Sequence, residues 1–170
     1  MIVTSTGIVD GHIQDRFGQK GTQFNEAGVP TYSLPLKIEQ APEGTLSFAF
    51  VLEDKDAYPV VGFSWIHWMG ADLTRTELRE NESLHAADFV QGANSWISLQ
   101  GGSLAKDVCS GYGGMTPPDA PHRYELHVYA LDALLELPQG FLFNELHRRM
   151  EGHILDQATL KGIYSHDPEE

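Results

Sequence analysis

Short runs of apolar residues recur along the chain, several of them alternating with polar positions, which is the pattern of strands rather than of long helices. The run 46–52 is apolar at nearly every position and predicts a central strand covered on both faces. The aromatic run 63–69 and the alternating run 123–131 predict two further strands. Residues 153–164 predict a closing strand.

Helical patterns are few. Residues 141–151 place Leu142, Leu146 and Met150 four positions apart, which predicts an amphipathic helix. Residues 74–77 have capping-box spacing and predict one helical turn. The turn-rich stretch 10–30 predicts an exposed loop, and the polar tail 166–170 is expected to fray. We therefore expect a mainly β protein, a single domain over residues 1–170, with a few short peripheral helices.

Composition and charge narrow the classes of partner and compartment. A chain of 170 residues can bury a core without disulfides or metals, and its 17 glycines and 9 prolines suit a turn-rich β architecture. The net charge of −13 disfavours nucleic acids and anionic membranes as partners. Cys109 is the single cysteine, and residues 1–4 do not begin a secretory signal pattern. With no apolar run near the roughly 20 residues that span a bilayer, we predict a cytoplasmic protein without membrane insertion.

Ionisable residues cluster where two of the predicted strands end or turn inward. Asp54 and Asp56 follow the central strand, where carboxylates two residues apart can point the same way from an extended backbone. The alternative is a solvated acidic turn. His67 lies between Trp65 and Trp68, so its ring needs hydrogen-bond partners, which could be those carboxylates or a backbone carbonyl.

A third cluster combines a glycine-rich loop with the start of a strand. Residues 111–118 read Gly-Tyr-Gly-Gly-Met-Thr-Pro-Pro, so that Gly113 allows close approach and Pro117 holds the loop extended, which suits a pocket wall. His122 and Tyr124 share the inward parity of their strand, and Arg123 points away.

The order of these motifs, over residues 32–164, resembles the phosphatidylethanolamine-binding protein family, most closely its prokaryotic Raf-kinase-inhibitor-like branch. The resemblance implies a β-sandwich with Greek-key connectivity and an anion-accepting cavity at one end. It also implies a homodimer and, among family members, inhibitors of kinases or proteases. The family usually reads Asp-Pro-Asp-Ala-Pro where this chain has Lys55 and an added Tyr58, so the loop there is expected to differ. The candidate ligand-binding residues are Asp54, Asp56, His67, Gly113, Pro117, His122 and Tyr124.

The chemistry of these residues favours a small anion, such as a phosphate-like headgroup. Two imidazoles, a phenol and backbone N–H groups of the glycine loop would donate to its oxygens, and neighbouring carboxylates would raise the histidine pKa values. Affinity is then expected to rise as the pH falls through about 6.5.

Two alternatives use the same pocket. They are a hydrolase-type acid–base enzyme and a zinc site of two histidines and a carboxylate. The chain carries none of the common hydrolase, zinc-protease, phosphate-loop or dinucleotide motifs, so we predict no cofactor and no metal. Regulation of an unidentified protein partner is a third class.

Overall fold

Two β-sheets form the framework of the computed structural model, which describes residues 1–165. Within these residues the large sheet has seven strands, in the order β2-β3-β10-β9-β5-β6-β8, and the small sheet has three, in the order β1-β4-β7. The strands of the large sheet are β2 (Ile8–Val9), β3 (His12–Ile13), β5 (Ser47–Asp54), β6 (Trp65–Leu73), β8 (Val90–Gln91), β9 (His122–Leu131) and β10 (Ile154–Tyr164). Those of the small sheet are β1 (Ile2–Thr4), β4 (Leu36–Glu39) and β7 (Glu77–Leu78).

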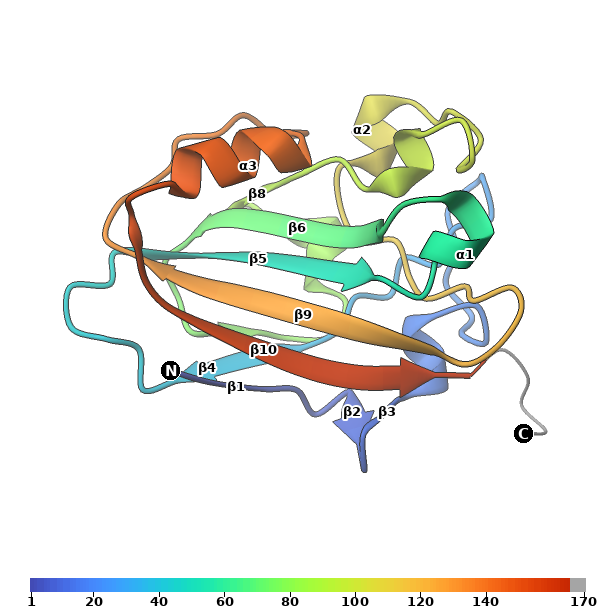
Figure 1. Ribbon diagram of the computed structural model, residues 1–170, viewed down its shortest axis with the longest axis horizontal. Coiled ribbons are helices and arrows are strands. Elements are labelled where there is room, and N and C mark those ends of the chain that lie inside the picture. The colour runs from blue at the N-terminus through green and yellow to red at the C-terminus, as the bar shows by residue number, and fades with distance from the viewer. Residues whose placement is uncertain (166–170) are drawn as a thin grey trace.

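The connectivity of the large sheet explains how the motif-bearing strands become neighbours. β5, β6 and β8 pair in sequence as antiparallel neighbours, and β9 then returns to the free side of β5. This spatial order is that of a Greek key. The predicted mainly β sandwich with Greek-key connectivity is therefore confirmed, and β5, β6 and β9 lie side by side (Figure 1).

β5 is buried on both faces, as its sequence predicts. Phe48, Phe50 and Leu52 pack into the core between the two sheets. Ala49 and Val51 face the opposite way, into a second core that includes Leu146 and Met150 of the helix 143–150. Burying apolar surface on both faces contributes about 25 cal/mol per Å² and fixes the register of this strand, since a slip of one residue would exchange its two faces.

In the described part of the chain, three short helices lie beside the large sheet. α1 (Tyr58–Val61) follows the end of β5, whereas α3 (Phe143–Met150) covers the end where β5 begins (Figure 1). The predicted amphipathic helix is confirmed, although Leu142 caps it and lies partly exposed. No helix among residues 1–165 is long and apolar enough to cross a bilayer. The remaining helical segments are α2 (Lys106–Cys109) and three 3-10 turns, Asp15–Phe17, Glu82–His85 and Ser95–Ile97.

Two local predictions are wrong. Residues 74–77 form no helical turn, because Leu78 pairs with Leu36 in the small sheet and is buried in the core, which outweighs a local cap. The stretch 10–30 is only partly exposed, since Phe17 is fully buried in the same core. The fraying predicted for residues 166–170 lies outside the described residues.

Candidate functional site

A row of three residues across three strands forms the base of the site. Asp54, the last residue of β5, lies opposite Trp65 of β6 and opposite Tyr124 of β9. Directly opposed residues of neighbouring strands project from the same face of a sheet. The sheet register therefore places a carboxylate, an indole and a phenol together, although they come from distant parts of the chain.

A bulge in β6 adds His67 to this row. The pairing passes from Leu52 with Trp68 to Glu53 with Ile66, so His67 is an extra residue opposite β5. Bulges redirect side chains in this way and are common next to functional sites. The His67 ring packs edge-on against Tyr124, with ring centroids 5.2 Å apart.

Two hydrogen bonds join Gly113 to His67 and fix the orientation of the His67 ring. The Gly113 carbonyl oxygen accepts a hydrogen bond from Nδ1 at 2.7 Å, and the Gly113 N–H donates to the His67 carbonyl at 2.8 Å. A carbonyl can only accept, so Nδ1 carries the proton and leaves Nε2 of the neutral ring as an acceptor. Complete burial lowers the pKa of His67, which opposes the expectation that its pKa is raised. A Cβ at position 113 would lie 2.4 Å from the Trp96 ring, so glycine is required there.

His122 lies between two carboxylates. Its Nδ1 is 2.7 Å from Oδ2 of Asp54, and its Nε2 is 2.9 Å from Oδ1 of Asp119. Burial opposes the charged ring, but the hydrogen bonds and charges of Asp54 and then Asp119 outweigh it, so the pKa of His122 is raised. An imidazolium that donates from both nitrogens satisfies both partners.

These residues line a cavity of about 270 Å³ that is partly open to solvent. Much of its wall is apolar, and no lysine or arginine is among its lining residues. The lining residues are Asp54, Ala57, Val60, Val61, Trp65, His67, Trp96, Gln100, Gly101, Thr116, Pro118, His122 and Tyr124.

Polar atoms without partners are concentrated at this cavity. Among residues 1–165, four buried side-chain nitrogen or oxygen atoms lack a hydrogen bond of normal geometry. Three of them, Oδ1 of Asp54, Nε1 of Trp65 and the hydroxyl of Tyr124, belong to the cavity wall. Burial and then the charge of Asp54 raise the pKa of Tyr124, so its hydroxyl stays protonated and can donate.

Three of the residues selected from the sequence lie outside this wall. β5 ends at Asp54 and residues 55–57 turn, so Asp56 does not follow it along an extended backbone. Its carboxylate instead accepts the Arg123 N–H at 2.9 Å and belongs to a separate surface hollow. Gly113 lies behind His67, and Thr116 and Pro118 stand in the wall rather than Pro117.

The glycine loop does not offer the free backbone donors expected of it. The N–H of Gly113 donates to His67, and the N–H of Gly114 donates to the Pro30 carbonyl. The donors come from Trp65 and Tyr124 instead. Aromatic residues beside a histidine were the available signal for Trp65, whereas no sequence pattern marks Asp119.

Comparison with known proteins assigns the family. A family model described as phosphatidylethanolamine-binding protein matches residues 4–165. The chain belongs to the phosphatidylethanolamine-binding protein family. The resemblance to this family inferred from the motif order is thereby confirmed, whereas the Raf-kinase-inhibitor-like branch stays a prediction.

Individual relatives and solved structures are similar to most of this chain. The uncharacterised protein YxkA of Bacillus subtilis is 39% identical over 154 residues, covering 88% of this chain and 92% of that protein. A UPF0098 protein of Chlamydia trachomatis is 33% identical over 137 residues, covering 79% and 83%. The crystal structure of the phosphatidylethanolamine-binding protein homologue CT736 from Chlamydia trachomatis has a TM-score of 0.77 and 31% identity, with 97% of each chain covered. The structure of YbcL from E. coli, at 24% identity and a TM-score of 0.73, shares the fold.

A second group of ionisable residues lies on the outer face of the sheet in this family member. Ligand atoms of Glu53, Glu125 and His127 lie within 4.8 Å of one another, close enough to surround a metal ion. Lys55 and Lys161, however, already contact Glu125 at 2.6 and 2.9 Å. The hydrogen bond from His127 to Glu53, despite burial, holds the pKa of that carboxyl at about 2. These contacts describe a paired ionic network that stabilises the three neighbouring strands.

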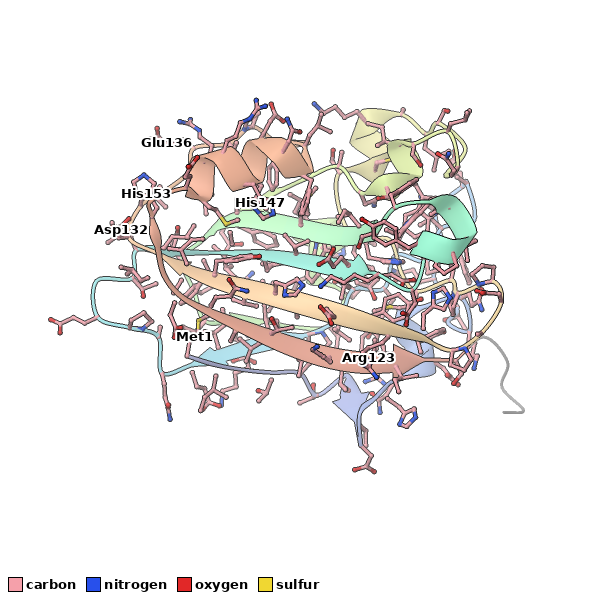
Figure 2. The ribbon with its side chains drawn as sticks, viewed as in Figure 1. Met1, Arg123, Asp132, Glu136, His147 and His153 are labelled. Carbon is pink, nitrogen blue, oxygen red and sulfur yellow. The ribbon has the colours of Figure 1, made fainter. Side chains whose placement is uncertain are left out.

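His153 is part of a further histidine–carboxylate pair, which lies on the surface and away from the cavity. His153 pairs with Asp132 at 2.8 Å, and Figure 2 shows both at the end of the sheet away from α1. Arg123, on the outward parity of β9, lies towards the other end (Figure 2). Both His153 and Asp132 are about half exposed, so their pairing is a weak surface contact.

Proposed function

We propose that this protein binds a small molecule through a phosphate-like headgroup in the cavity of Asp54, Trp65, His67, His122 and Tyr124. The observation that carries the proposal is the group of unpartnered buried atoms in its wall. Buried polar groups in native proteins nearly always have partners, and leaving one without a partner costs about 1–3 kcal/mol. Three such atoms at one cavity support a site that is completed by a bound molecule.

The donors and acceptors of the wall suit a headgroup of mixed character. The Trp65 N–H and the Tyr124 O–H can donate to phosphate oxygens, and the His122 imidazolium supplies positive charge. The unpartnered oxygen of Asp54 can accept a proton-bearing group of the same ligand, such as a hydroxyl or an ammonium. A phosphate that carries an ethanolamine, as in the lipid that names the family, has both features.

The apolar part of the wall indicates a ligand with a non-polar portion. Val60 and Val61 of α1 and the ring of Trp96 line the cavity beside the polar row. Ligand sites commonly combine such apolar walls with a few placed polar groups.

The enzyme alternative has less support. An acid–base mechanism through the pair of Asp54 and His122 needs a ring nitrogen that can accept a proton. In its imidazolium form His122 donates from both nitrogens to carboxylates, so the charged ring has no nitrogen that can accept a proton.

The test is titration with phosphoethanolamine and with inorganic phosphate at pH 6, followed by calorimetry and by the histidine ring signals in NMR. We expect saturable binding by the wild type and a loss of at least about tenfold in Tyr124→Phe, which removes one donor. Tyr129→Phe is the matched control, since Tyr129 lies in the core on the other face of the sheet. No saturable binding by the wild type, or equal affinity in Tyr124→Phe, would refute the proposal.

The homodimer, the cytoplasmic location and the regulation of a kinase or protease stay predictions that rest on the sequence and its resemblance. Light scattering after gel filtration tests the first. A pull-down with wild type and His122→Ala tests whether any protein partner depends on the cavity.

A further inference from the structure

Asp119 covers the outer edge of a ring that is otherwise buried. It lies on the bend between Pro118, which lines the cavity, and the start of β9. Its side chain is 56% exposed, whereas that of His122 is 4% exposed. The carboxylate oxygen Oδ1 lies 2.9 Å from Nε2 of His122.

We propose that the Asp119 carboxylate competes with ligand anions for His122 and thereby determines which anions the cavity binds. This inference rests on the proposed function. The inner nitrogen of His122 is held by Asp54, which is buried on β5, so Nε2 is the nitrogen of this cavity-lining ring whose partner is an exposed carboxylate. Carboxylate and phosphate oxygens accept the same kind of charge-assisted bond, so Asp119 and a bound anion compete for one proton.

The two carboxylates differ in how easily they leave the ring. Asp54 is fixed by strand pairing on both sides, whereas Asp119 stands in an exposed bend outside any strand. Because the Asp119 side chain is more than half exposed, water can solvate its carboxylate when it leaves the ring. A ligand can therefore displace Asp119 and leave Asp54 in place.

This competition makes Asp119 a specificity-determining residue. A singly charged carboxylate such as acetate offers His122 the same group that Asp119 already provides, so replacing Asp119 by acetate yields little binding free energy. A phosphate carries up to two charges and more acceptor oxygens, and it gains more from the imidazolium and from the donors of Trp65 and Tyr124. The wild type should thus discriminate strongly between phosphate and acetate.

The experiment compares wild type, Asp119→Ala and Glu43→Ala in titrations with inorganic phosphate and with sodium acetate at pH 6. Glu43 is exposed, in the β4–β5 connection at the end of the sheet away from α1 (Figure 1), so its variant removes the same charge at a distance where salt screens it. We expect Asp119→Ala to bind phosphate roughly tenfold more tightly, with a larger gain for acetate, and Glu43→Ala to match the wild type.

The outcomes separate this inference from the proposed function. If the wild type binds phosphate and Asp119→Ala binds it equally or more weakly, the competitor role is wrong and the proposed function stands. If no variant binds phosphate, both are wrong. If Glu43→Ala gains as much as Asp119→Ala, the effect is one of net charge, and the competitor role is again refuted.

Discussion

The unpartnered hydroxyl of Tyr124 predicts that removing it stabilises the free protein. Tyr124 is 1% exposed, and its oxygen has no hydrogen bond of normal geometry among residues 1–165. Folding therefore removes this hydroxyl from bulk water and returns only its contact with the Asp54 carboxylate, which falls short of a hydrogen bond of normal geometry. Tyr124→Phe keeps the ring and its packing against His67 while it removes the desolvated group.

The magnitude follows from the cost of an unsatisfied buried hydroxyl, about 1–3 kcal/mol. For a chain of this length, each kcal/mol shifts the Tm by about 2–4 °C. We expect Tyr124→Phe to unfold at least about 2 °C above the wild type. The same change at Tyr112 should have the opposite sign, because the Tyr112 hydroxyl donates to the Phe17 carbonyl at 2.7 Å and its loss leaves that buried oxygen without the bond.

The assay is thermal and urea unfolding of wild type, Tyr124→Phe and Tyr112→Phe without ligand, repeated with excess phosphoethanolamine. We expect the ligand to raise the Tm of the wild type more than that of Tyr124→Phe, since only the former has the donor. Ligand-free Tyr124→Phe that is destabilised as much as Tyr112→Phe would refute the reasoning, because the hydroxyl would then have a partner that stabilises the fold.

Three further predictions concern the site and the outer network. Gly113→Ala should cost about 1–3 kcal/mol in urea unfolding and weaken phosphate binding, because its Cβ would collide with the Trp96 ring; an unchanged midpoint would contradict this. The pKa of His122 is raised, so its positive charge is fully present below about pH 6.5 and is lost as the pH rises through the raised pKa. Phosphate affinity and a part of the folding stability should fall over the same pH range. A calorimetric pH series in which affinity falls with a midpoint at or below about pH 6.5 would oppose this. The pKa of Glu53 is depressed to about 2, so its contribution to stability is present above pH 4.5 and is lost as the pH falls through about 2; Glu53→Gln should flatten the acid limb of the unfolding curve by about 1–2 kcal/mol, and an unaltered limb would argue against the pairing with His127.

Strand parity accounts for most of what the sequence could predict. Alternation places His122 and Tyr124 inward and Arg123 outward, and the structure agrees. The continuous apolar run of β5 correctly predicts a strand buried on both faces. These features are visible because each is repeated at a fixed period, which a single sequence records.

Features that arise where a bulge or a turn breaks the two-residue alternation of a strand could not be predicted in the same way. The bulge at His67 and the turn after Asp54 each change the direction of a side chain without a change in composition. Asp56 therefore belongs to a different surface from Asp54, although only Lys55 lies between them. The contact of Asp119 with His122 depends on the path of a short loop, which hydrophobic patterning does not specify.

The pairing of Asp54 with Tyr124 has a consequence for the order in which the molecule matures. This pairing joins residues far apart in the chain, and such contacts form late because a long loop must first close. β5 and β6 can pair beforehand as local neighbours, and Asp54 then faces Trp65 alone. A newly made chain would thus form the β5–β6 pair before it can bind a ligand, and ligand binding would begin only once β9 has paired with β5.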